Sequence, residues 1–376
     1  MKINLTPLAL TVNNLDVTSI SFKVITLKAL RQLFGEKLFL NIDNADVLNH
    51  YLDKVSNVKV VEKVNIAIQR LTNAKLCKND EFYTQLSDVN KELVHYKEYF
   101  KNKVVLCNCD DESSAFWEYF HMLFESIGLK KLIATHYDRN KPTYKVEYMG
   151  GNDNDLKCCV TTPLKGDGDF RNDENISLLQ EADIVVTNPP FSLFREYIAQ
   201  LIKYNKKFIV IGNQNAIKYK EIFPLIKDNK LWLGYGSNLA MVFKTPYVNV
   251  VEKNRKLVKS KGFNPDDGYI VTPAVSWFTN IEHTKRHEPL ILWKEYHPEE
   301  YPKYDNYDAI EVKKVELIPK DYFYEMGVPI TFMDKYCPEQ FEIIGGYNYS
   351  TDLNGKPWNA KVNGEYVYAR ILIKRK

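Results

Sequence analysis

The chain has 376 residues, 45% of them apolar, which is enough for two domains with sizeable cores. Its 51 Lys and Arg nearly balance its 48 Asp and Glu, and a net charge of +3 leaves a polyanionic partner open, because a balanced total can hide a basic face. No apolar run approaches the roughly 18 residues of a membrane-spanning helix. The N-terminus is too short and polar for a signal peptide, so we expect a cytoplasmic protein with no membrane partner.

Residues 1–76 have a pattern of their own. The stretch T-S-I-S-F-K-V-I-T-L (18–27) predicts a strand, and N-A-D-V-L-N-H-Y-L-D-K-V (44–55) predicts a helix that Asn44 caps. No group in this segment indicates chemistry. We therefore expect an N-terminal α+β extension of unknown role.

Residues 77–245 alternate between predicted strands and helices, which is typical of an α/β domain with a mostly parallel, doubly wound sheet. Strands are predicted at 103–109, 130–137, 182–188 and 206–214. A helix over 112–128 has Ser113 as a cap and Gly128 as its stop, and the helix after the third strand carries an apolar face of Phe194, Tyr197, Ile198, Leu201 and Ile202.

Polar clusters follow three of these strands: N-C-D-D (108–111), T-N-P-P-F (187–191) and G-N-Q-N (212–215). Ligands of doubly wound sheets bind outside the carboxyl ends of the strands, so we expect the clusters to converge there.

Residues 246–376 lose this alternation and are rich in Lys, Tyr, Pro and His. We interpret them as a loop-rich second region that ends in a basic tail, which a solvated terminus explains as well as a phosphate contact does.

Six cysteines are present, and no pair has the C-x-x-C spacing of structural zinc sites: Cys77, Cys107, Cys109, Cys158, Cys159 and Cys337. His283 and His287 in H-T-K-R-H lack the Glu of the zinc-protease motif, so a surface helix or loop is the better interpretation. We expect unpaired thiols and no metal.

The stretch D-I-V-V-T-N-P-P-F (183–191) ends a buried strand on an amide, two prolines and an aromatic ring. Proline has no amide hydrogen, so the chain must leave the sheet in a stiff, extended turn. The Asn188 side-chain oxygen and the Pro189 carbonyl could then accept the hydrogens of an exocyclic amino group, while Phe191 stacks on its ring. The alternative is that the prolines only end a strand and Phe191 fills a core.

The stretch L-K-G-D-G-D-F-R (164–171) precedes that strand. Asp169 could accept a hydrogen bond from an adenine amino group and Phe170 could pack on the ring, as a cofactor carrying adenosine would need. The alternative is ordinary turn chemistry, which Gly-Asp-Gly also serves.

These motifs resemble the EcoRI-type adenine-specific DNA methyltransferases from about residue 78 to the end. The matching stretches are D-E-F-Y-T-Q (80–85), V-V-L-C-N-C-D-D (104–111), K-G-D-G-D-F-R (165–171), A-D-I-V-V-T-N-P-P-F-S-L-F-R-E-Y (182–197), I-G-N-Q-N-A-I (211–217) and M-G-V-P-I-T-F-M-D-K-Y (326–336). The resemblance implies a Rossmann-like sheet, a target-recognition region in 246–376, and methyl transfer from S-adenosylmethionine to a flipped adenine in double-stranded DNA, without a metal.

The resemblance also implies roles for individual residues. The catalytic set is Asn188, Pro189, Pro190 and Phe191; the cofactor-binding set is Tyr83, Thr84, Asn108, Cys109, Asp110, Asp111, Asp169 and Phe170. The Gly-rich loop of the wider methyltransferase class is replaced by C-N-C-D-D-E-S-S, a trait of the EcoRI type, and Asp138 is the candidate for the cofactor ribose.

Two rival functions remain open at this point. N-P-P-aromatic motifs also serve methylation of RNA bases and of protein amides, and a relative that binds DNA without catalysis would keep the fold. We expect a monomer, because each strand of a palindrome can be modified in a separate event. A cognate restriction endonuclease is a partner that the resemblance allows.

Overall fold

The computed structural model describes residues 83–108, 110–137, 143–151, 159–237, 239–245, 252–272 and 274–376. All of them belong to one compact unit, residues 81–376. The predicted extension (1–76) lies outside the described residues, as do Cys77, Cys109, Asp138 and Cys158.

An eight-stranded mixed sheet forms the centre of this unit, in the order β5-β4-β3-β2-β6-β7-β11-β8. Its strands are β2 (Val104–Cys107), β3 (Lys131–Thr135), β4 (Tyr144–Tyr148), β5 (Cys159–Pro163), β6 (Ile184–Thr187), β7 (Lys207–Asn213), β8 (Trp232–Leu233) and β11 (Val275–Thr279).

The four central strands β3, β2, β6 and β7 are parallel, whereas every pairing on the flanks is antiparallel. The sheet is therefore less parallel than we predicted, because β4 and β5 return without crossover helices. The chain runs from β2 to β3 on one side and continues through β6 to β7 on the other. The strand order thus reverses between β2 and β6, which is where open α/β sheets bind ligands.

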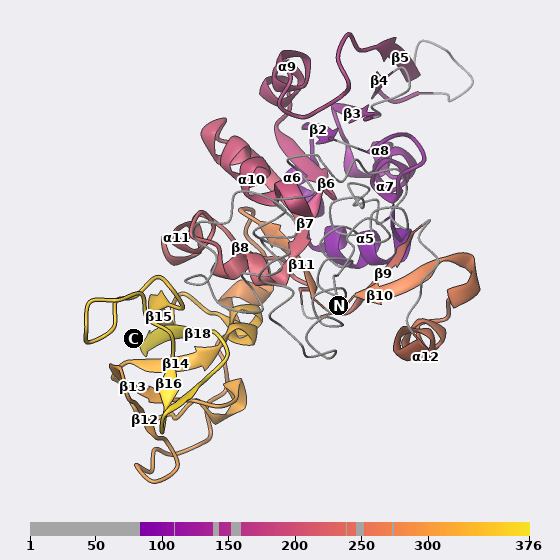
Figure 1. Cartoon of the computed structure of the whole chain (residues 1–376). Helices are drawn as coiled ribbons and strands as arrows, with labels where there is room; N and C mark the ends of the chain where they lie inside the picture. Colours follow the sequence, from indigo (N-terminus) through magenta and orange to yellow (C-terminus); the bar gives the residue numbers. More distant parts are fainter. Residues whose placement is uncertain are drawn as a thin grey trace, which may run out of the picture. The chain divides into compact units, whose positions relative to one another are not determined.

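Helices cover both faces of this sheet (Figure 1). Alternate strand residues point to opposite faces: Val105 and Val186 pack with α5 (Leu86–Leu93), α7 (Ala115–Met122) and α8 (Phe124–Ile127). On the other face, Val185 and Val210 pack with α9 (Asp173–Glu181), α10 (Phe194–Lys203) and α11 (Phe223–Lys227).

Local sequence signals explain several helix ends. Four of the five predicted apolar residues of α10 are buried: Phe194, Tyr197, Ile198 and Leu201. The stop at Gly128 is confirmed by its left-handed φ of 71°. The cap of α7, however, is Ser114, whose hydroxyl accepts from the Trp117 N–H, and the predicted single helix is divided at Leu123 into α7 and α8.

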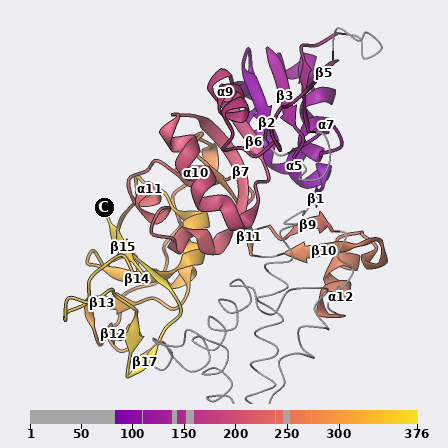
Figure 2. The same cartoon turned by 45° about the horizontal axis from the view of Figure 1, so that its top comes forward.

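The region after residue 245 contains more sheet than the predicted loops. A five-stranded sheet has the order β12-β13-β14-β18-β15, a small sheet joins β1 to β9 and β10 (Figure 2), and β16 pairs with β17. The bounds are β1 (Tyr83–Thr84), β9 (Met241–Lys244), β10 (Tyr269–Thr272), β12 (Lys303–Tyr304), β13 (Tyr307–Glu311), β14 (Met326–Pro329), β15 (Phe341–Gly346), β16 (Lys361–Val362), β17 (Glu365–Tyr366) and β18 (Arg370–Arg375). Because β11 belongs to the central sheet, that sheet continues past the predicted boundary at 245.

The remaining helices are short. They are α6 (Lys97–Phe100), α12 (Glu252–Ser260) and the 3-10 helices η2 (Val94–Tyr96), η3 (Phe191–Leu193), η4 (Gln214–Lys218), η5 (Pro265–Asp267), η6 (Thr284–His287), η7 (Val315–Leu317) and η8 (Ile330–Lys335). Across the described ranges, no helix combines the length and apolar character that crossing a bilayer requires.

Candidate active site

The carboxyl ends of β2 and β6 meet at the point where the strand order reverses. Oδ2 of Asp110 lies 2.5 Å from the Thr187 hydroxyl oxygen, and the Asp110 carboxyl accepts a hydrogen bond from the Asn188 backbone N–H. Two of the predicted polar clusters, N-C-D-D and T-N-P-P-F, therefore converge as expected. Burial raises the pKa of Asp110 to about 7, against the opposing effect of the hydrogen bonds from Thr187 and Asn188.

The N-P-P-F segment leaves the end of β6 as an extended turn. Pro190 has φ −54° and ψ 123°, and its carbonyl accepts a 2.9 Å hydrogen bond from the N–H of Leu193, the last residue of η3. Pro189 is buried, whereas Asn188 and Phe191 are half-buried. The prolines thus end the ladder as predicted, and Asn188 and Phe191 remain partly exposed at the end of β6.

Thr84 lies beside this turn although it is about a hundred residues away in sequence. Tyr83 and Thr84 form β1, which pairs antiparallel with β9. The Asn188 Nδ2 donates to the Thr84 hydroxyl at 3.4 Å, and Thr84 is only 8% exposed. The structure therefore brings Thr84 together with Asn188.

Asn108 and Asp111 have different surroundings at the end of β2. The side-chain oxygen of Asn108 accepts a 2.9 Å hydrogen bond from the Thr135 hydroxyl of β3, and Asn108 is 1% exposed. Asp111 accepts from the Ser113 N–H and hydroxyl and lies 3.1 Å from His136 Nδ1. Asn108 hence joins two strands, while Asp111 keeps a partly exposed carboxylate.

The 165–171 loop packs against the end of β3. Gly168 has a φ of 79°, and a Cβ there would lie 2.5 Å from the His136 carbonyl oxygen, so glycine is required for this close approach. Asp169 is held by Arg171, whose Nη2 donates to Oδ2 at 2.6 Å. Because Asp111 also contacts His136, the Asp111 carboxylate and the backbone at Gly168 both lie beside the end of β3.

The sequence predicts that Phe170 packs on an adenine ring, whereas the structure buries Phe170 in the core. Its ring is 2% exposed and lies edge-on to Tyr197 of α10, with centroids 4.9 Å apart, while the Arg171 guanidinium covers it at 5.3 Å. The ring is therefore part of the core, because the loop closes onto α10, and the structure gives Phe170 a packing role.

The third cluster, G-N-Q-N (212–215), packs against the first residue of α10, the helix that follows the N-P-P-F turn. Gly212 of β7 lies under the ring of Phe194, the first residue of α10, and a Cβ at Gly212 would lie 2.6 Å from Cζ of that ring. Asn213 caps η4 by accepting from the Asn215 N–H, and Asn215 accepts from the hydroxyl of Tyr368 near β18. This hydrogen bond connects η4 with the segment before β18, and no local sequence pattern could predict it.

Replacing Gly212 by Ala should lower the free energy of unfolding by about 1–3 kcal/mol, because the added methyl group overpacks a fully buried ring. Chemical denaturation measures the loss. Adding Phe194→Leu should recover part of it, since the smaller side chain leaves room; an unchanged midpoint in the single variant would show that Phe194 can move away.

Glu92 is a buried carboxyl that the sequence analysis missed. At 0% exposure it accepts hydrogen bonds from the Tyr235 N–H (2.7 Å), the Gly236 N–H (2.6 Å) and the Tyr96 hydroxyl (2.8 Å). It holds the segment between β8 and β9, and β9 pairs with the strand that carries Thr84. The sequence did carry one signal of a close backbone contact, the glycines on both sides of Tyr235. A Cβ at either glycine would crowd the Glu92 carboxylate.

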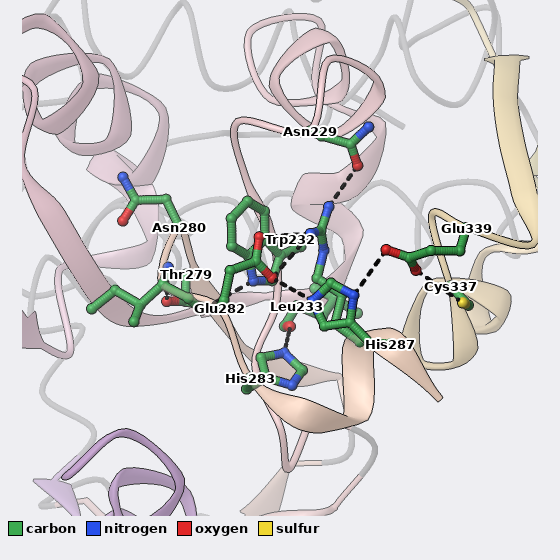
Figure 3. A network of polar contacts seen from close by, with 12 residues as sticks. Asn229, Trp232, Leu233, Thr279, Asn280, Glu282, His283, His287, Cys337 and Glu339 are labelled. Carbon is green, nitrogen blue, oxygen red and sulfur yellow. Dashed lines mark hydrogen bonds and ion pairs between the residues drawn. The ribbon is translucent and has the colours of Figure 1, made fainter. Parts of the chain in front are cut away.

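The H-T-K-R-H stretch forms the 3-10 helix η6 and a polar network (Figure 3). Arg286 donates to Glu282 and Asn229 and lies 4.0 Å from the Trp232 ring centroid, and His287 contacts Glu282 and Glu339. The prediction of a surface segment is wrong for His283 and Arg286, each 7% exposed, because they pack against β8.

Within the described ranges, no group of three or more His, Cys, Asp or Glu side chains is arranged to hold a metal ion. Three cysteines, Cys107, Cys159 and Cys337, are described, and none of these three forms a disulfide.

Comparison with known proteins identifies close relatives. The sequence model of the family described as "Adenine-specific methyltransferase EcoRI" matches residues 70–376. The chain is 45% identical over 329 residues to the Type II methyltransferase M.EcoRI of Escherichia coli, covering 83% of this chain and 98% of that protein. It is 40% identical to the Type II methyltransferase M.MpnI of Mycoplasma pneumoniae, covering 81% and 97%. No solved structure matches significantly.

Proposed function

Because the chain belongs to the EcoRI family of adenine-specific methyltransferases, we propose that it transfers a methyl group from S-adenosylmethionine to N6 of an adenine in a defined sequence of duplex DNA. The observation that carries the proposal is the Asn188–Phe191 turn at the end of β6, where the strand order reverses. The parallel centre of the sheet supports its assignment to the Rossmann-like class.

The Asn188 turn has the groups needed to prepare an aromatic amine for attack. The adenine amino lone pair is delocalised into the ring, so acceptors for its two hydrogens increase electron density on nitrogen as it becomes tetrahedral. The Asn188 side-chain oxygen and the Pro189 carbonyl are the proposed acceptors, and Phe191 is the proposed stacking partner. A base must leave the duplex to reach them, which costs about a few kcal/mol of unstacking.

The residues at the strand ends fit a cofactor with hydroxyl and amino groups. The side chains of Asp111 and Asp169 are 27% and 15% exposed, so each carboxylate can accept further hydrogen bonds. We propose that these two carboxylates, with Tyr83 and Thr84 of β1, hold the cofactor, while Asn108, Asp110 and Phe170 shape the surrounding segments. The bound cofactor supplies an electrophilic methyl group whose thioether leaves without an acid, so no protein residue needs to protonate it.

The region after residue 245 is the proposed site of target recognition. Its described surface carries exposed Lys and aromatic side chains, among them Lys303, Tyr324 and Tyr366. Lysines that contact phosphates would make binding sensitive to salt, and side chains in a groove would select the sequence. A monomer acting on one strand at a time, with a cognate restriction endonuclease in the same cell, fits this proposal.

The acceptor can be identified by incubating the chain with methyl-labelled S-adenosylmethionine and, in parallel, duplex DNA, RNA and protein. We expect label only in DNA, as N6-methyladenine within one short sequence motif. Label in RNA or in a protein amide would contradict the proposal and support the first rival function. Cofactor binding by calorimetry without transfer to any acceptor would support a DNA-binding relative that lacks catalysis.

A further inference from the structure

The Thr187 hydroxyl lies between two oxygen atoms at the junction of β2 and β6. One is Oδ2 of Asp110, 2.5 Å away, and the other is the backbone carbonyl oxygen of Asn108. Thr187 is fully buried, so water does not replace either contact. A hydroxyl group has one hydrogen, and it can be donated to only one of these oxygens at a time.

The chemistry of the two neighbours decides where the hydrogens lie. A carbonyl oxygen cannot donate, so the contact with Asn108 is a hydrogen bond only if Thr187 donates to it. The short contact with Asp110 is then a hydrogen bond only if the Asp110 carboxyl carries a proton and donates to the Thr187 oxygen. The remaining lone pairs of the carboxyl accept the Asn188 N–H.

We propose that Asp110, in its protonated form, is a positioning residue that fixes the Asn188 turn by donating to Thr187 and accepting from the Asn188 N–H. This inference rests on the proposed catalytic role of Asn188, and it replaces the supporting role beside the cofactor assigned to Asp110 above. A hydrogen-bond chain thus runs from Asp110 through Thr187 to the Asn108 carbonyl, and ties the end of β6 to the end of β2. Asp110 acts through Asn188 and touches no substrate itself.

The surroundings of Asp110 favour the neutral carboxyl. Burial is the main cause of its raised pKa of about 7, and the negative charge of Asp111 adds to it. Asp111 itself contacts His136 at the end of β3, and the Cys107 thiol is a neighbour of Asp110 from the last residue of β2. The neighbours from β6 and the turn after it, Thr187 and Asn188, are neutral. When Asp110 ionises, it can only accept, so Thr187 turns its hydrogen toward Asp110 and its oxygen faces the Asn108 carbonyl unbridged.

Three variants test this arrangement: Asp110→Asn, Asp110→Ala and, as a neighbouring carboxyl outside the site, Glu112→Gln. An amide at 110 can donate to Thr187 and accept from Asn188, so it imitates the protonated acid, whereas Ala does neither. Single-turnover methylation of duplex DNA should stay within about 3-fold of wild type in Asp110→Asn and fall about 100-fold in Asp110→Ala, since small misplacements of reacting groups have effects of that size.

The pH profile and the cofactor affinity separate positioning from other roles. The wild-type and Glu112→Gln rates should decline as pH rises through about 7, where Asp110 ionises, and the Asp110→Asn rate should lack that step. Calorimetric affinity for S-adenosylmethionine should change little in all three. An Asp110→Asn protein as slow as Asp110→Ala would overturn the proposal, and so would an Asp110→Ala protein whose only defect is weaker cofactor binding.

An infrared difference spectrum tests the protonation state without any activity. At pH 6 the wild-type protein minus Asp110→Asn should show the carbonyl stretch of a protonated carboxylic acid, which disappears by pH 8. A carboxylate signal at pH 6 would contradict the inference. If wild type and Glu112→Gln methylate nothing while the carboxylic acid band is present, the proposed function fails and the hydrogen-bond chain stands.

Discussion

Asn188→Ala is expected to reduce the single-turnover rate of DNA methylation by at least about 100-fold, the size of effect found when one preorganised hydrogen-bond partner of a reacting group is removed. The Asn188 side chain is half-buried at the end of β6, and its amide is the polar group of the turn that is suited to an adenine amino group. Its alanine variant should keep the backbone N–H that donates to Asp110, so the turn itself should persist.

The matched control is Asn90→Ala, an exposed asparagine of α5 that belongs neither to the proposed site nor to the proposed target-recognition region. It should methylate at the wild-type rate. Circular dichroism and the denaturation midpoint of Asn188→Ala should match those of wild type, because the lost contact with Thr84 is a long one. Full activity in a folded Asn188→Ala protein would remove Asn188 from the mechanism.

Glu92→Ala is expected to lower the free energy of unfolding by about 3 kcal/mol, because it leaves the N–H groups of Tyr235 and Gly236 without their buried acceptor. The side chain also supports the segment that leads to β9, and β9 pairs with β1. Urea denaturation measures the loss. Glu98→Ala on the exposed side of α6 is the control and should stay within about 0.5 kcal/mol of wild type.

The stability difference should also depend on pH. Burial raises the pKa of Glu92 from 4.5 to about 7, so the folded protein holds this proton more tightly than the unfolded chain does. The contribution of the group is therefore fully present below the unfolded pKa and is lost as pH rises through the folded pKa. Wild type should exceed Glu92→Ala by more at pH 5 than at pH 8. The reverse order would mean that Glu92 is charged in the folded protein.

The elements that could be predicted are those whose signals are local. The β6 strand is a continuous apolar run that two prolines must end, the face of α10 follows from a helical period, and Gly128 is a standard helix stop. The meeting of the β2 and β6 ends followed from the rule that parallel strands carry their ligands at one edge. Local pattern and general topology were sufficient for these features.

The features that could not be predicted depend on contacts between distant segments. The strands β12 and β8 have two residues each, too few to show a period, and they exist because of the strands beside them. Phe170 was predicted to pack on an adenine ring, and only the position of α10 explains its burial against Tyr197. Glu92 pairs with backbone groups more than a hundred residues away, and such pairs leave no local pattern.

The most direct test of the account is mass spectrometry of the nucleosides in DNA from a host without its own methyltransferases, expressing either the wild-type chain or Asn188→Ala. We predict N6-methyladenine with the wild-type chain and none with Asn188→Ala. Methylated cytosine, unmodified DNA from the wild-type culture, or equal N6-methyladenine in both cultures would contradict the account.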